Sequence, residues 1–371
     1  MTTSLRTTTV SLSEPSETLA AVPYLLGFCP SESLVLLSVG SADARPKLEL
    51  TVRLDLPEHG AYRALLDYIV RGPVLQRRTE GLVVVVVGGT GASPPAGRGT
   101  VEVELDDAPD VWAESAPETP DLPHQDFVEE LQRSLTMRGI EVLHGLWTEE
   151  IRAGEPWECY RDADCHGTIP DPKASALAAT LAAAGTVTYS SREELQALLT
   201  PENGDLLSER AARLDLLHEE RELNAVDVHS DLATVFGAIR RTAEASALTE
   251  DDHVRVLCAL ADTRVRDVVL GTTLETTARA AEELWITLLR KAPEPELADV
   301  AALLAFSAYV RGDGALAGVA LERIEATRPE HALGQLLRQA LDAALPPVEL
   351  AAVAREASAD ARVLIDEEGS W

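Results

Sequence analysis

The stretch LVVVVVGGTGASPPAGRG (residues 82–99) joins an unbroken apolar run to a glycine-rich segment. A run of this kind is too apolar for a half-exposed strand, so residues 82–87 predict a strand in the middle of a sheet. A hydrophobic strand followed by glycines is also how many nucleotide-binding sites begin. The stretch therefore indicates an α/β domain and raises the question of a phosphate site.

The segment after this strand lacks the parts that bind a phosphate. Gly89 and Gly91 fit the first two positions of a dinucleotide fingerprint, but Pro94 occupies the third and no helical pattern begins until about His124. The helix N-terminus that would bind a pyrophosphate is therefore missing. No Gly-Lys-Ser/Thr sequence occurs, so a Walker loop is excluded. We expect a flexible acidic insertion at about residues 90–122. The alternative is an acidic segment that attracts and binds a basic partner.

The segments around this strand predict an α/β domain with a mixed sheet over residues 16–200, after a disordered lead over residues 1–15. Residues 33–40 and 47–56 form a hairpin, and residues 140–151 pair antiparallel with residues 155–160. Leu48, Leu50, Val52 and Leu54 are expected on one apolar face. Helices are expected at residues 16–28, which Pro23 begins or interrupts, and at 59–70, 124–139 and 175–185.

From about residue 206 the strand signals disappear, and residues 206–371 predict an all-α domain of helical hairpins. Ser230 is expected to cap one helix, and Thr249 with Asp252 to form a capping box on the next. Residues 303–329 approximate one tetratricopeptide repeat, with Leu304, Ala305 and Ala308 on the first helix and Ala317, Leu321 and Ile324 on the second. A plain helical bundle is the alternative.

Composition limits the classes of partner. The net charge of -30 repels phosphate backbones, so we expect no nucleic-acid ligand. No apolar run resembles a signal peptide or approaches the length that spans a bilayer, which predicts a cytoplasmic protein without membrane contact. Four scattered cysteines do not form a disulfide framework, so reduced thiols are expected.

The stretch WECYRDADCHG (residues 157–167) holds the densest group of metal-capable side chains, Cys159, Cys165 and His166. Structural zinc takes four ligands with short cysteine spacing, whereas here five residues separate the cysteines. Of the other two cysteines, Cys29 is the one sensible further ligand, if the N-terminal helix packs nearby. A polar loop after a strand is the alternative. Three aromatic residues nearby, Trp147, Trp157 and Tyr160, make the same region a candidate ligand site.

Catalytic motifs are missing from the chain. There is no G-x-S-x-G elbow, His144 lies in an apolar strand pattern, and Cys258 lies among apolar residues. We therefore predict no catalytic residue and no cofactor, with zinc as the one cofactor to test, and favour a protein that is not an enzyme.

The chain resembles an uncharacterised actinobacterial family, the domain of unknown function 4192. The similar stretches, in order, are AAVPYLLGFCPSESLVLLSV (20–39), RLDLP (53–57), GLW (145–147), VRDVVL (265–270) and AFSAYVRGDGALAGVALERI (305–324). In the tryptophan loop, Cys159 stands where the family commonly has serine and His166 where it often has cysteine. The resemblance implies an architecture and an actinobacterial source, and it transfers no catalytic residue.

Two hypotheses follow. The preferred one is a non-catalytic cytoplasmic interaction or scaffold protein whose C-terminal helices bind a protein or peptide. The alternative is a metal-dependent or small-ligand-binding enzyme or sensor with its site around residues 157–167.

Overall fold

The computed structural model describes residues 14–42, 45–72, 79–89, 122–183, 185–224 and 227–368. Contacts between Cα atoms divide the chain into two compact units, Met1–Thr188 and Tyr189–Trp371. Most of the expected disordered lead, and all but the last residue of the expected insertion, lie outside the described residues. The domain boundary expected at residues 200–206 stays a prediction.

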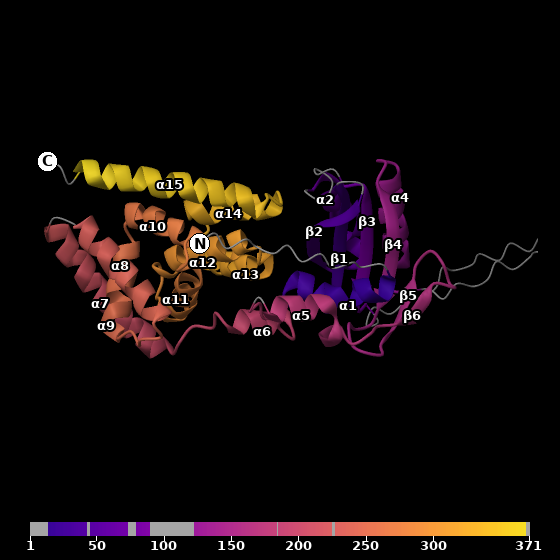
Figure 1. Cartoon of the computed structure of the whole chain (residues 1–371), viewed down its shortest axis with the longest axis horizontal. Coiled ribbons are helices and arrows are strands. Elements are labelled where there is room, and N and C mark those ends of the chain that lie inside the picture. The colour runs from indigo at the N-terminus through magenta and orange to yellow at the C-terminus, as the bar shows by residue number, and fades with distance from the viewer. Residues whose placement is uncertain are drawn as a thin grey trace, which may run out of the picture. The chain divides into compact units, whose positions relative to one another are not determined.

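The first unit contains a mixed six-stranded sheet in the order β2-β1-β3-β4-β5-β6 (Figure 1). The strands are β1 (Ser33–Ala42), β2 (Arg45–Asp55), β3 (Gly81–Val87), β4 (Glu141–Thr148), β5 (Pro156–Cys159) and β6 (His166–Thr168). Only β3 and β4 run parallel, and every other neighbouring pair is antiparallel. The predicted mixed sheet, with the valine-rich strand in its interior, is confirmed.

Helices cover both faces of this sheet. They are α1 (Pro15–Leu26), α2 (Tyr62–Arg71), α4 (Gln125–Thr136) and α5 (Ala176–Ala183), with short 3-10 turns at His59–Ala61 and Pro172–Ala174. In β3, Leu82, Val84 and Val86 pack on the α2 and α4 side, whereas Val83, Val85 and Val87 pack on the α1 side. Burial on both faces explains why this strand has no polar alternation.

A β-bulge in β2 overturns one expectation. Ser38 pairs with Leu50 but Val39 pairs with Leu48, which leaves Glu49 without a partner in the register. An extra residue reverses the facing of everything beyond it. Leu48 therefore packs on the α1 side, and the prediction that it shares a face with Leu50 was wrong.

The first helix also differs from its prediction. It begins at Pro15, whose fixed φ suits the first helical turn, and it runs through Pro23 to end before Gly27 at φ 82°. Pro23 is buried inside the helix. The expectation that Pro23 begins or interrupts the helix was wrong.

The second unit is all-helical in its described part, as predicted. Its helices are α6 (Arg192–Ala197), α7 (Gly204–Leu223), α8 (Val228–Ala243), α9 (Glu250–Leu260), α10 (Thr263–Leu270), α11 (Ala278–Lys291), α12 (Leu297–Arg311), α13 (Gly314–Thr327), α14 (Ala332–Asp342) and α15 (Pro347–Glu368), with a 3-10 turn, η3, at Gly271–Leu274. The capping box of Thr249 and Asp252 is present at the start of α9. The cap of α8 is Asp227, which accepts from the Ser230 N–H, so the assignment of Ser230 was wrong.

Helix α12 lies at the centre of the second unit. It packs against α9, α10, α11, α13, α14 and α15, and its residues from Val300 to Tyr309 are all buried. A helix that is apolar all round belongs in the middle of a bundle. The resemblance of α12 and α13 to a tetratricopeptide repeat stays a prediction.

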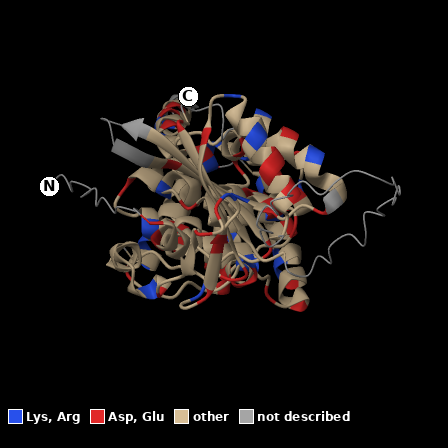
Figure 2. Cartoon of the chain, turned by 90° about the vertical axis from the view of Figure 1, so that its right-hand side faces the viewer, with Lys and Arg blue, Asp and Glu red and all other residues tan. Residues whose placement is uncertain are grey.

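Charge and hydrophobicity are distributed as the layers require. Figure 2 shows the strands as largely uncharged, with acidic and basic residues on the surrounding helices and loops. Within the part of the chain that the structure describes, no helix combines the length and the apolar character needed to cross a membrane.

Candidate functional site

The side chains of the tryptophan loop separate onto two faces of the sheet. Trp157 in β5 is buried on the α1 side, where Cys159 and Cys165 also pack. Tyr160, directly after β5, is buried on the α2 and α4 side. His166 at the start of β6 is exposed. The strand alternation therefore divides the residues that the sequence places together.

The metal candidates lack a complete set of ligands. Burial and the neighbouring Cys159 thiol raise the pKa of Cys165. The Nδ1 atom of His166 lies 3.1 Å from the Ala163 carbonyl oxygen. Cys29 packs on the same face but donates its thiol to the Ile151 carbonyl at 3.7 Å. Among the residues with described positions, no three His, Cys, Asp or Glu side chains are placed to hold a metal. Zinc at Cys159, Cys165 and His166 stays a prediction.

The indole nitrogen of Trp157 is a buried polar atom of the loop. The side chain is only 6% exposed, and its indole Nε1 has no hydrogen-bond partner among the described residues. Gly167 lies against the indole ring, where a Cβ atom would come within 3.1 Å of Nε1. The glycine thus permits the close approach of β6 to the ring, and the loop packs around an apolar contact.

Trp147 and Tyr160 act at the carboxyl ends of β3 and β4. The Trp147 indole donates to the Gly88 carbonyl at 2.9 Å, and the Tyr160 hydroxyl donates to the Pro123 carbonyl at 2.5 Å. Gly88 precedes residues 90–121 in the chain, and Pro123 follows them. These two aromatic side chains therefore hold the two flanks of that segment.

Three further side chains complete the arrangement. The Gly89 N–H donates to both carboxylate oxygens of Glu32 at 3.2 Å, and the Tyr62 hydroxyl lies 3.0 Å from Nδ1 of His124. We call Glu32, Tyr62, His124, Trp147 and Tyr160 the stem clamp.

Only two residues of the stem clamp, Trp147 in β4 and Tyr160 after β5, were predicted from the sequence as part of a ligand site. Glu32 and Tyr62 carry no motif, and His124 marks the start of a helical pattern and nothing more. The available signal was Gly88 and Gly89, which adopt φ values of 90° and 85°. A Cβ atom at Gly89 would meet the His124 ring at 2.9 Å, so this backbone position requires glycine.

The stem clamp lies where open α/β sheets commonly bind ligands, at the carboxyl ends of parallel strands. Its hydrogen bonds, however, run mainly to the backbone of the chain itself. Burial raises the pKa of Tyr160 well above its ordinary value, which keeps the phenol neutral and donating. The stem clamp therefore positions the backbone at Gly88, Gly89 and Pro123.

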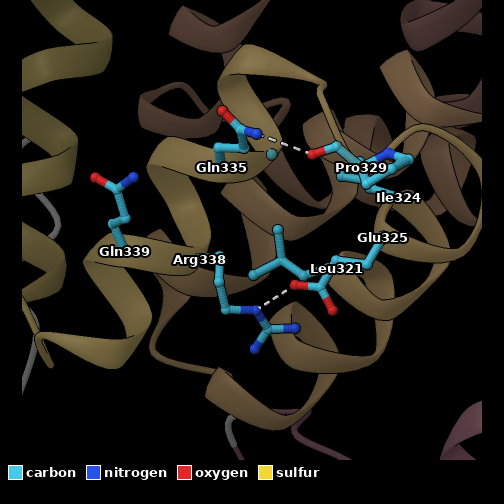
Figure 3. Close-up of a pocket in the computed structure, with 8 residues that line it drawn as sticks. Leu321, Ile324, Glu325, Pro329, Gln335, Arg338 and Gln339 are labelled. Atoms are coloured by element: carbon cyan, nitrogen blue, oxygen red, sulfur yellow. Dashed lines mark hydrogen bonds and ion pairs between the residues drawn. The ribbon is translucent and has the colours of Figure 1, made fainter.

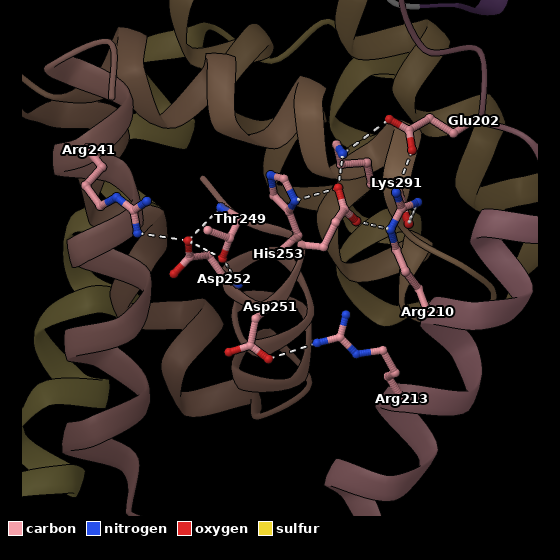
Figure 4. Close-up of polar contacts among 10 residues, drawn as sticks. Glu202, Arg210, Arg213, Arg241, Thr249, Asp251, Asp252, His253 and Lys291 are labelled. Atoms are coloured by element: carbon pink, nitrogen blue, oxygen red, sulfur yellow. Dashed lines mark hydrogen bonds and ion pairs between the residues drawn. The ribbon is translucent and has the colours of Figure 1, made fainter. Parts of the chain in front are cut away.

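A cluster of charged side chains joins three helices of the second unit (Figure 4). Arg210 of α7 is 4% exposed and donates to Glu202 at 2.6 Å, to Glu250 at 2.8 Å and to the Lys291 carbonyl at 3.2 Å. The Lys291 ammonium lies 2.7 Å from Glu250 and 3.3 Å from Glu202. Hydrogen bonds from Lys291 and Arg210 lower the pKa of Glu250 to about 2. The cluster thus holds α7, α9 and α11 together by ion pairs.

A buried histidine and aspartate in the second unit resemble part of a catalytic triad. Nε2 of His331 lies 3.0 Å from Asp299, which also pairs with Arg266 at 2.9 Å. Nδ1 of His331 accepts from the Gly334 N–H at 3.1 Å, so both ring nitrogens are engaged. A general base needs a free lone pair, and this histidine instead caps α14.

A groove of about 320 Å³ opens between α13 and α14 (Figure 3). Leu321, Ile324 and Pro329 contribute apolar surface, and Gln335 and Gln339 contribute amides. Arg338 donates to Glu325 at 2.6 Å, and the two charges neutralise one another beside the groove. The groove therefore offers apolar contact and neutral hydrogen-bonding groups.

Comparison with known proteins identifies a family whose description assigns no function. Residues 15–348 match the model of the family described as "Domain of unknown function (DUF4192)". No curated protein and no solved structure matches the chain.

Proposed function

Because the chain belongs to the DUF4192 family, whose description assigns no activity, we propose a function from its geometry: the protein is a non-catalytic interaction protein that binds a peptide segment of a partner in the α13 and α14 groove. The groove between Leu321, Ile324 and Pro329 is the observation that carries this proposal. Its volume of about 320 Å³ is at the lower end for ligand sites and matches a small number of side chains.

The lining of the groove indicates the chemistry of the peptide. Apolar side chains at its base favour an apolar anchor residue. The exposed Gln339 amide and the Gln335 amide oxygen are able to pair with peptide backbone groups, whereas the Gln335 amide nitrogen donates to the Pro329 carbonyl at 3.0 Å. The net charge of -30 favours basic residues beside that anchor and disfavours nucleic acid. We therefore expect a segment with an apolar anchor between basic residues.

The hydrogen bonding of the titratable groups supports a non-catalytic role. In the Arg210 cluster and in the His331 and Asp299 pair, the polar atoms that would carry chemistry bind other side chains or backbone. The alternative function, an enzyme or sensor at residues 157–167, draws support from the aromatic side chains there. Its metal-dependent form has no ligand trio within the described ranges.

A selection from a displayed peptide library against the full-length chain tests the proposal. Enriched peptides should share an apolar anchor and bind the purified protein in fluorescence anisotropy. Gln335→Trp and Gln339→Trp place a large ring in the groove from exposed positions, so each should weaken binding at least tenfold.

Ala233→Trp on α8 is the matched control, because it adds the same ring at an exposed helical position outside the groove. Peptides that bind Gln335→Trp and Gln339→Trp as tightly as the unmodified chain would show that the groove is not the site. A selection without any enriched sequence would count against peptide binding altogether.

A further inference from the structure

The register of β5 and β6 brings two cysteines to facing positions. Trp157 pairs with Gly167, and Glu158 pairs with His166. One step further along the same register places Cys159 opposite Cys165. Residues directly opposite one another in antiparallel strands have Cα atoms about 4.5–5.5 Å apart, and disulfides form between Cα atoms about 4.4–6.8 Å apart. The backbone therefore needs no rearrangement to join these two residues.

The side chains and the connecting loop agree with this placement. Cys159 and Cys165 both pack on the α1 side of the sheet, and burial together with the neighbouring Cys159 thiol raises the pKa of Cys165. Between them, the Asp162 carbonyl accepts from the Cys165 N–H at 3.0 Å, and the Asp162 carboxylate accepts from the Asp164 N–H at 3.0 Å. The turn already brings the two ends of the loop together, so little chain entropy is lost when a bond forms between the two cysteines.

The other two cysteines lack such a neighbour. The Cys29 thiol donates to a backbone carbonyl, and Cys258 is 3% exposed inside α9. Cys159 and Cys165 are both partly exposed and both free. A reagent in solution can therefore reach the facing pair, and a second thiol is in place to complete the reaction.

We propose that Cys159 and Cys165 form a reversible disulfide that closes the loop at residues 160–164, with a small-molecule or protein disulfide as the oxidant. One cysteine thiolate attacks the oxidant disulfide, forms a mixed disulfide and releases one thiolate. The second cysteine thiolate then attacks the mixed disulfide at the protein sulfur and releases the other thiolate. The two cysteines lose two protons and two electrons, and the oxidant disulfide becomes two thiols.

The disulfide would act on the neighbouring stem clamp. Tyr160 directly follows Cys159 and donates to the Pro123 carbonyl at the start of α4. A bond between Cys159 and Cys165 fixes the backbone on both sides of the loop that begins with Tyr160. The oxidised state therefore holds this clamp residue more firmly than the reduced state does.

Tryptic mapping of the full-length protein tests the proposal, because each cysteine falls in its own peptide. Cleavage after Arg161 separates Cys159, in residues 153–161, from Cys165, in residues 162–173. The folded protein is equilibrated at pH 7 in mixtures of reduced and oxidised glutathione, alkylated and digested. The linked pair of peptides should rise from a trace in reduced glutathione to most of the protein in oxidised glutathione, and dithiothreitol should reverse it.

Two variants and one further measurement complete the design. Cys29→Ser should leave the linked pair unchanged, whereas Cys165→Ser should abolish it and leave glutathione bound to Cys159. Amide hydrogen exchange of residues 156–168 in the unmodified chain should slow at least threefold on oxidation. The proposal is overturned if oxidised glutathione links Cys29 or Cys258 as readily, or forms stable mixed disulfides without closing the loop. It is equally overturned if the pair links only in denaturant.

Discussion

The two units of the chain use different interactions to fix their polar groups. In the α/β unit the stem clamp consists mainly of hydrogen bonds from aromatic and backbone donors, among them Trp147 to Gly88 and Tyr160 to Pro123. In the helical unit, ion pairs around Arg210 and Asp299 join the helices. A sheet satisfies its backbone between strands and needs side chains only at its ends, whereas packed helices have no backbone bonds between them. The difference teaches that the helical unit should depend on charge and the α/β unit should not.

The largest expected effects come from the cores and test whether the units unfold separately. Phe127→Ala removes a buried ring from the α/β unit, and Trp285→Ala removes one from the helical unit. Each should lower the free energy of unfolding of its own unit by about 4 kcal/mol. Urea unfolding followed by amide hydrogen exchange reports the two units by their peptides. A loss that spreads equally to both units would show that they unfold as one.

Breaking the Arg210 cluster should be the next largest effect. Arg210→Ala removes the buried guanidinium that bonds Glu202, Glu250 and the Lys291 carbonyl, and it leaves the two carboxylates with the Lys291 ammonium alone, so the helical unit should lose about 3 kcal/mol. Arg213→Ala, which removes an exposed pair with Asp251, is the control and should cost less than about 1 kcal/mol. Equal losses in the two variants would mean that burial adds nothing to the Arg210 pairs.

Acid should weaken the helical unit selectively. Its ion pairs and hydrogen bonds lower the carboxyl pKa of Glu202, Glu250, Asp262 and Asp299. A carboxyl group whose pKa is lower in the folded than in the unfolded protein stabilises the fold at pH values above the unfolded pKa, which is 4.5 for Glu250. This stabilisation is lost as the pH falls toward the folded pKa of about 2. Because Glu250 is half-exposed and screened by solvent, we expect a total loss of about 2 kcal/mol between pH 7 and pH 3. Unfolding curves at the two pH values measure it, and Arg210→Ala should show a smaller change.

The smallest expected effect concerns one hydrogen bond of the stem clamp. Tyr160→Phe removes the donor to the Pro123 carbonyl and should cost about 1 kcal/mol in the α/β unit. Because the pKa of a phenol is ordinarily 10 and burial raises it further here, the phenol is neutral at pH 7 and at pH 3, and the cost should be the same at both. Hydrogen exchange at the start of α4 provides the measurement. A cost that changes with pH would contradict the contrast between the units.

The features that sequence predicts here are those with a local cause. The valine run is apolar at every position, so its own composition predicts burial on both faces. The capping box of Thr249 and Asp252 forms within a single helical turn. By contrast, the bulge at Glu49 depends on how β1 and β2 pair, so the facing of Leu48 cannot be read from alternation alone. The cap of α8 illustrates a finer limit, because Asp227 and Ser230 are both good capping residues.

The candidate site was less predictable than the fold for the same reason. Cys159, Trp157 and Tyr160 are neighbours in sequence, but strand alternation sends Trp157 and Tyr160 to opposite faces. Glu32, Tyr62 and His124 are far apart in the chain, and only the completed sheet brings them to one edge. Arg210 has no sequence signal for burial, since an arginine on a polar helix is ordinarily exposed.

The held flanks at Gly88, Gly89 and Pro123 have a consequence for how this chain tolerates change in length. Hydrogen bonds with Glu32, Trp147 and Tyr160 hold both flanks in place. Each doubling of a connecting segment adds only about 0.6 kcal/mol of closure entropy. Insertions, deletions and whole foreign domains should therefore be tolerated between these flanks. This end of the sheet is accordingly a suitable insertion site, both in evolution and in protein engineering.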